Sequence, residues 1–210
     1  SLPSGSNLYL TASVGVSVFP DTAGDLLSLL RQADLATNRA KRSGRNCAFQ
    51  FTIDLEEALN DRLALGSRIR GALDREEFLL HFQPQVSAHS GELITLEALV
   101  RWNSPELGLL PPRRFIPVAE DCGLIMRLGG WVLRNACAHL RQWLEQGLGE
   151  VVMAVNVSAS QMQRDSFVDD VRNALETYRI PPALLELDLT ESVIMENVER
   201  AEAQMRALKA

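Results

Sequence analysis

Apolar residues recur at every second position in some segments and at every third or fourth in others. This predicts a chain of alternating strands and helices. The expected strands cover residues 9–19, 47–51, 78–87 (ending near Pro84), 92–102, 151–158 and 184–191. The expected helices cover residues 25–43, 54–75, 113–122, 125–146 and 161–178, followed by an amphipathic helix that runs to residue 210. Apart from a first hairpin-like pair, this order predicts an α/β fold with a largely parallel sheet or barrel.

The strand at residues 92–102 carries a carboxylate, Glu97, in the middle of an apolar run. Both alternating sets of positions are partly apolar, which predicts burial on both faces. A buried carboxylate is costly unless it is ion-paired, hydrogen-bonded or bound to a metal. An ion pair with Arg101 or another basic group is one explanation, and a metal site is the other.

Polar residues also stand at or near the ends of two later strands. Asn156 lies in "AVNVS" and Glu191 in "LDLTES". In parallel α/β folds, active sites form at the carboxyl ends of the strands. Two carboxylates and an amide suit Mg²⁺, Mn²⁺ or Ca²⁺ better than Zn²⁺. Gln83 and Arg101 should lie on neighbouring strand ends, where they could hydrogen-bond a polar or anionic ligand.

Composition narrows the alternatives. The net charge of −6 argues against a nucleic-acid polymer or an anionic membrane as a partner. No apolar run approaches the ~20 residues of a membrane span, so we expect no membrane segment in this span and a cytoplasmic location, although an upstream region could hold an anchor. The separated cysteines Cys47, Cys122 and Cys137 are expected to be buried thiols. The three scattered histidines, His81, His89 and His139, are expected to be structural or exposed.

Four ordered motifs resemble those of the EAL domain, a family of bacterial cyclic-di-GMP phosphodiesterases built on a modified (β/α)8 barrel. They are "FQPQV", "LEALVRWNSPELGLLPPRRFIPVAEDCGLI", "AVNVSASQ" and "LELDLTES". The resemblance implies that Glu97, Asn156 and Glu191 are catalytic metal ligands for Mg²⁺ or Mn²⁺. It also implies that Gln83, Leu99 and Arg101 contact the cyclic dinucleotide.

The beginning of the chain resembles the C-terminal end of a GGDEF domain, the diguanylate cyclase fold. The resemblance rests on "LTASVGVSVFP" and "ADLATNRAKRSGRN", and implies that Lys41 and Arg45 reach nucleotide phosphates. The expected organisation is therefore a GGDEF remnant at residues 1–52, a connecting helix at 53–76 and the first half of an EAL barrel at 77–210. The GGDEF loop itself is absent from the sequence, so no cyclase activity is implied.

The family's later motifs, a DDFGTG loop and a following lysine, glutamate and glutamine, are expected beyond residue 210. We therefore expect the chain alone to be inactive and the parent protein to hydrolyse cyclic-di-GMP to linear pGpG. A module that binds cyclic-di-GMP without hydrolysis is the second hypothesis. A regulatory scaffold without a ligand is the third, and association as a homodimer is an open option.

Overall fold

The computed structural model describes residues 10–189 and 197–209, without the side chains of residues 58 and 59. The chain divides into two compact units, residues 1–64 and 65–210. The helix α2 (Ile53–Asp74) runs across this division without a break, in agreement with the helix predicted for residues 54–75. No described helix is long and apolar enough to cross a membrane.

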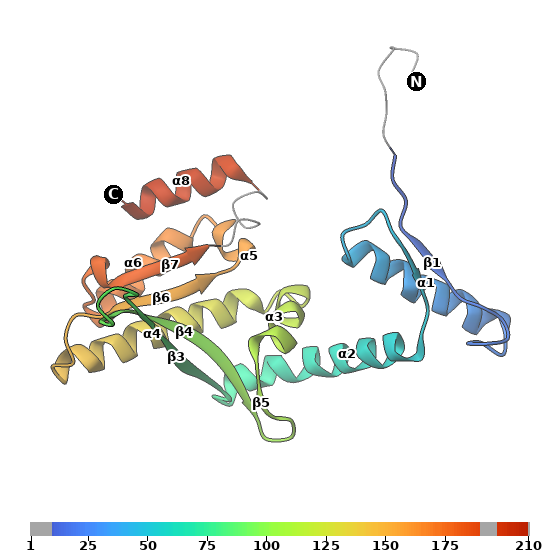
Figure 1. The fold of residues 1–210 in the computed structure, drawn as a ribbon, viewed down its shortest axis with the longest axis horizontal. Helices are drawn as coiled ribbons and strands as arrows, with labels where there is room; N and C mark the ends of the chain where they lie inside the picture. Colours follow the sequence, from blue (N-terminus) through green and yellow to red (C-terminus); the bar gives the residue numbers. More distant parts are fainter. Residues whose placement is uncertain (1–9, 190–196, 210) are drawn as a thin grey trace, which may run out of the picture. The chain divides into compact units, whose positions relative to one another are not determined.

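The described part of unit 1 is a small β–α–β arrangement (Figure 1). Strand β1 (Val14–Val16) pairs in parallel with β2 (Ala48–Gln50), and α1 (Leu26–Arg42) connects them. Gly15 lies against α1, where an added Cβ would overlap the backbone of Thr37. Strand β1 is shorter than the strand predicted for residues 9–19.

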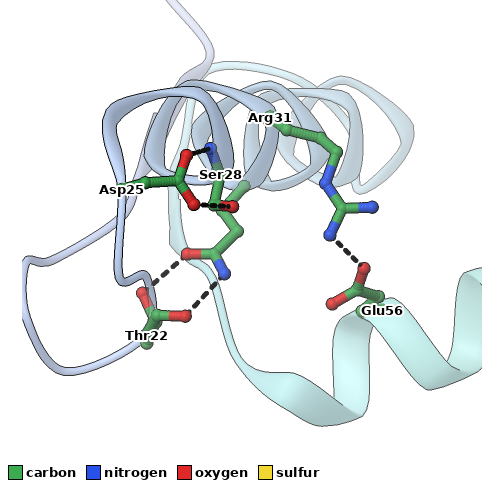
Figure 2. A network of polar contacts seen from close by, with 6 residues as sticks. Thr22, Asp25, Ser28, Arg31 and Glu56 are labelled. Atoms are coloured by element: carbon green, nitrogen blue, oxygen red, sulfur yellow. Dashed lines mark hydrogen bonds and ion pairs between the residues drawn. The ribbon is translucent and has the colours of Figure 1, made fainter.

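Helix α1 begins and ends as its sequence predicts. The side chain of Asp25 accepts hydrogen bonds from the backbone N–H (2.9 Å) and the hydroxyl (2.7 Å) of Ser28. Arg31 forms an ion pair with Glu56 of α2 (Figure 2). The hydroxyl of Thr22 donates a hydrogen bond to Oε1 of the buried Gln32, and Gln32 Nε2 donates to the carbonyl of Thr22. The contacts between Asp25 and Ser28 cap the start of α1, as expected for Asp at this position.

Unit 2 contains a five-stranded mixed sheet with the order β3–β4–β6–β7, to which β5 adds beside β4. The strands β4, β6 and β7 are parallel, as predicted, and β3 is antiparallel to β4, as the hairpin-like pair predicted. Strand β5 is also antiparallel to β4. Strand β5 was not predicted, and β3 continues two residues past Pro84. The strand bounds are β3 (Phe78–Val86), β4 (Leu93–Ser104), β5 (Gly108–Leu110), β6 (Val152–Val157) and β7 (Leu185–Leu189).

Helices cover one face of this sheet. Helices α3 and α4 contact β4, α4 also contacts β3 and β6, α6 packs on α4, and α8 packs on α6. The bounds are α3 (Pro112–Asp121), α4 (Ile125–Glu145), α5 (Ala159–Met162), α6 (Phe167–Tyr178), α8 (Val198–Lys209) and the 3₁₀ turn η1 (Pro182–Leu184). The single helix predicted for residues 161–178 is wrong, since the chain leaves α5 after Met162 and begins α6 at Phe167.

The core lies between the sheet and α3–α4. Ala98, Val100 and Trp102 of β4 are buried there, whereas Glu97, Leu99 and Arg101 on the alternate positions are only half-buried. The prediction that β4 is buried on both faces is therefore wrong. Leu99 is the apolar residue that suggested burial of the second face, and it is only half-buried.

Other expectations about burial have mixed outcomes. Cys137 is buried, but Cys47 is half-buried and Cys122 exposed. Of the residues expected to face the core from the last helix, Met205 and Leu208 pack against it, whereas Val198 is exposed and Met195 lies outside the described residues. His139 packs edge-on against Phe82, which confirms a structural role for that histidine.

A buried glutamate fixes the start of β3. The Trp102 indole donates to Glu77 Oε2 (2.9 Å), and Arg75 Nε donates to Glu77 Oε1 (2.5 Å). The side chain of Glu77 is only 8% exposed. Burial raises the pKa of Glu77, but the two hydrogen bonds and the Arg75 charge outweigh it and leave the pKa below its ordinary value. The ionised form is therefore the one that the fold stabilises.

This arrangement predicts a loss of stability in acid. Because the folded-state pKa is depressed, the contribution of Glu77 is complete above the unfolded value of about 4.5 and is lost as the pH falls through the folded value. All three tryptophans lie in unit 2, so their fluorescence follows its unfolding. Between pH 7 and pH 3 the urea midpoint should fall less in Glu77→Gln than in the wild type. The control is Glu76→Gln at the exposed neighbouring residue, and its urea midpoint should fall with pH as much as that of the wild type. An equal fall of the urea midpoint in Glu77→Gln and in the wild type would contradict the stabilising role of ionised Glu77.

Candidate functional site

The register of the sheet brings polar side chains together on the face away from α4. Residues opposite each other on paired strands point to the same face. Glu97 lies opposite Gln83 on β3 and opposite Ala154 on β6, while Asn156 of β6 lies opposite Asp188 of β7. Glu97, Asn156 and Asp188 therefore occupy three adjacent parallel strands on one face.

Glu97 and Asn156 are in direct contact. The Asn156 Nδ2 atom donates a hydrogen bond of 2.7 Å to Glu97 Oε1. The ion pair between Glu97 and Arg101 that the sequence allowed is not what holds Glu97, since the Arg101 Nη1 atom donates to the carbonyl of Val100 (3.0 Å). Glu97 is half-buried and Asn156 exposed, so a ligand can approach both.

Asp188 is the member of this group that the sequence analysis missed. Burial raises the pKa of the Asp188 carboxyl, and the negative charge of Glu97 raises it further. Strand β7 lies two strand spacings of ~4.8 Å from β4. The side chains of Glu97 and Asp188 extend into the space between these strands on the same face. Alternation could have identified Asp188, because it shares its face of β7 with Glu186, two residues earlier.

The three side chains suit a hard divalent cation. Glu97, Asn156 and Asp188 offer only oxygen ligands, as Mg²⁺ and Mn²⁺ prefer. Burial and repulsion by Glu97 together raise the pKa of Asp188, and a cation would relieve the repulsion. Within the described residues, no three His, Cys, Asp or Glu side chains group as metal ligands, so the amide of Asn156 has to supply the third oxygen.

The predicted substrate residues fall in different places along the sheet. Gln83 is directly opposite Glu97, but Arg101 is opposite Leu79, four residues further along β4. At ~3.3 Å per residue this separates Gln83 from Arg101 by about 13 Å, so the prediction that they lie on neighbouring strand ends is wrong. The antiparallel direction of β3 is the reason, because its carboxyl end lies beside the start of β4. Leu99 lies between Glu97 and Arg101 on the same face.

A cavity of about 550 Å³ opens beside this group. Glu97, Leu99 and Asn156 line one side of it, and α3 and α4 contribute Glu120, Ile116 and Gly129 among others. It therefore joins Glu97 and Asn156 on the sheet to a mostly apolar wall formed by two helices, a combination common in binding sites for small organic ligands.

Two further sets of predicted residues lie elsewhere. Lys41 is in the last turn of α1 and Arg45 follows it with a left-handed backbone (φ 61°), and both are exposed in unit 1. Glu191 lies outside the described residues. The roles expected for these three residues stay predictions.

Comparison with known proteins gives the family. The model of the EAL domain family matches residues 67–210, more than half of the chain. The chain belongs to the EAL domain family. The match begins within α2 and includes the whole sheet that carries Glu97, Asn156 and Asp188.

Relatives and solved structures agree with this membership. The chain is 38% identical over 201 residues to the bifunctional diguanylate cyclase/cyclic di-GMP phosphodiesterase MucR and 42% identical over 196 residues to the cyclic di-GMP phosphodiesterase NbdA, both of Pseudomonas aeruginosa. These alignments cover 96% and 93% of this chain, but only 29% and 25% of the relatives. The solved c-di-GMP complex of the PaMucR phosphodiesterase superposes with a TM-score of 0.67 at 41% identity, over 70% of this chain and 59% of that one.

The chain thus spans between a quarter and a third of the length of these EAL relatives. Their names state activities of whole proteins, in which this EAL segment is one part.

Proposed function

We propose that this EAL chain contributes to a metal-dependent phosphodiesterase that opens cyclic-di-GMP to linear pGpG. The observation that carries the proposal is the group of Glu97, Asn156 and Asp188 on one sheet face: Glu97 and Asn156 are hydrogen-bonded and line a cavity, and Asp188 lies opposite Asn156 on the next strand. The relatives named as cyclic di-GMP phosphodiesterases support the same reaction class.

Glu97, Asn156 and Asp188 would hold Mg²⁺ or Mn²⁺ through their oxygens, and Glu191 remains a proposed ligand of the same site. A bound divalent ion polarises a phosphoryl oxygen and lowers the pKa of coordinated water, which prepares the attack on phosphorus. The chain's own part is to fix the oxygens in place. The hydrogen bond between Asn156 and Glu97 supports this role, because it holds two of these side chains together.

Gln83, Leu99 and Arg101 are the proposed substrate contacts. All three share the sheet face of Glu97. The guanidinium of Arg101 suits a phosphate, because its planar donors match two phosphate oxygens. Leu99, next to the cavity, suits the apolar face of a base, and the amide of Gln83 can donate to a polar group of the ligand.

For unit 1 we propose the C-terminal part of a GGDEF-like domain, in which Lys41 and Arg45 would approach nucleotide phosphates. The parallel β1–α1–β2 unit and the alignment with the bifunctional MucR over 96% of the chain support this. A homodimer is a further proposal, made for the whole protein.

Measurements of cyclic-di-GMP binding and hydrolysis separate the three hypotheses for the EAL part, which are a phosphodiesterase, a binding module and a scaffold without a ligand. The whole protein should convert cyclic-di-GMP to linear pGpG in Mn²⁺, measured by chromatography of the nucleotides, and EDTA should stop it. Binding without product would favour a recognition module, and neither binding nor product would favour a scaffold. Residues 1–210 alone should give no turnover, because the DDFGTG motif that the EAL resemblance adds to the site does not occur in this sequence.

A further inference from the structure

The turn after β6 is closed by a buried glutamine. Gln161 is 7% exposed, although it is polar and uncharged. Its Oε1 atom accepts hydrogen bonds from the backbone N–H (3.1 Å) and the hydroxyl (2.9 Å) of Ser158. In return, the Gln161 N–H donates to Ser158 Oγ (3.4 Å), which completes a reciprocal capping box around α5.

A glycine of α4 makes room for this side chain. A Cβ atom added at Gly129 would overlap the Nε2, Cδ and Oε1 atoms of Gln161, the last at 2.7 Å. Glycine inside a helix is destabilising relative to alanine, so a mid-helix glycine calls for a packing or functional reason. The carboxamide of Gln161 supplies that reason at position 129.

The Gln161 side chain lies close to Asn156 and Glu97, two of the three residues of the proposed metal site. Ser158 is two residues after Asn156 and directly follows the end of β6. Gly129, Gln161, Ser158, Asn156 and Glu97 all line the same cavity. A shift of Ser158 would therefore carry the end of β6 with it and move the Asn156 amide away from Glu97.

We propose that Gln161, seated against Gly129, is a positioning residue that fixes the end of β6 and thereby holds the Asn156 amide against Glu97. The effect of Gln161 on catalysis rests on the proposed phosphodiesterase function. Its positioning of the Asn156 amide does not depend on that function. Groups that orient metal ligands typically change affinity or activity by about 10- to 100-fold when removed.

The test reads the Asn156 side chain directly. The whole protein, labelled with ¹⁵N on asparagine, gives side-chain amide resonances, and those of Asn156 are identified by their loss in Asn156→Asp. In Gln161→Ala and in Gly129→Ala these resonances should move away from their wild-type positions. The double variant Gly129→Ala/Gln161→Ala should resemble Gln161→Ala, because the added methyl group then has space.

Gly130→Ala is the matched control. It adds the same methyl group to the next residue of α4, where the only near atom is the Nη1 tip of Arg134 at 3.2 Å. Its Asn156 resonances and its turnover should equal those of the wild type, whereas Gln161→Ala should lower kcat about tenfold or more. If Gly129→Ala does not fold, Gln161→Ala decides the question, since it introduces no overlap.

Unchanged Asn156 resonances in Gln161→Ala would overturn the proposal, whatever the turnover of the protein. A wild-type protein without cyclic-di-GMP hydrolysis would instead contradict the proposed function, and the resonances would still decide whether Gln161 positions Asn156.

Discussion

Glu97→Ala should abolish most of the cyclic-di-GMP hydrolysis of the whole protein while leaving the fold intact. The variant removes one of the three proposed oxygen ligands and the hydrogen-bond acceptor of Asn156. A loss of ~3 kcal/mol of transition-state stabilisation corresponds to about a hundredfold in rate, so we expect at least that decrease in kcat/KM. The fold should tolerate the change because Glu97 is only half-buried and its charge is repelled by Asp188.

The control for Glu97→Ala is another carboxylate of the same sheet. Glu186 lies in β7 opposite Ala154 and is exposed. Glu186→Ala should keep wild-type turnover in Mn²⁺. Near-normal turnover of Glu97→Ala, measured at saturating Mn²⁺ with the same unfolding midpoint as the wild type, would remove Glu97 from the metal site.

Asp188→Asn should lose activity and gain stability in the absence of metal. Burial and the neighbouring Glu97 charge raise the pKa of the Asp188 carboxyl above its ordinary value of 3.8. The unfolded state therefore gives up its proton at a lower pH than the folded state does. As the pH rises above about 3.8 the fold loses stability relative to a neutral side chain, and the penalty is complete once the pH exceeds the folded value.

Asparagine carries no charge, so the variant should melt at a higher temperature than the wild type at pH 7 in EDTA. The difference should shrink toward pH 3, where the wild-type carboxyl is also neutral. Tryptophan fluorescence measures both melts in unit 2, and Glu186→Gln serves as the control on the same strand. A lower melting temperature for Asp188→Asn at pH 7 would mean that Asp188 makes a favourable contact that outweighs the repulsion.

Much of this could be predicted from alternation and from the order of motifs. The parallel strands β4, β6 and β7, the long helix α4 and the polar residues Glu97 and Asn156 follow from apolar periods and from residues that interrupt them. The EAL family was also predictable, because four motifs in the right order are specific where one is not.

The errors arise where tertiary pairing decides the outcome. The antiparallel pairing of β3 with β4, which the hairpin-like order predicted, places Gln83 opposite Glu97 and away from Arg101. The expectation that Gln83 and Arg101 lie on neighbouring strand ends did not take this pairing into account. Asp188 was omitted from the predicted site, whereas the register of β6 and β7 places it opposite Asn156. The role of Gln161 depends on its contact with Gly129, which lies 32 residues earlier on another helix. A single sequence does not reveal contacts between residues so far apart in the chain.

The central claim is that Glu97, Asn156 and Asp188 together bind a divalent cation, and Mn²⁺ binding by calorimetry tests it most directly. The whole protein, freed of metal, should bind Mn²⁺ without any nucleotide. Asp188→Asn should weaken this binding by about tenfold or more, and Glu186→Gln, two residues earlier on the same face, should not change it. Equal Mn²⁺ affinities for wild type, Asp188→Asn and Glu97→Ala would show that the cation binds elsewhere and would contradict the account.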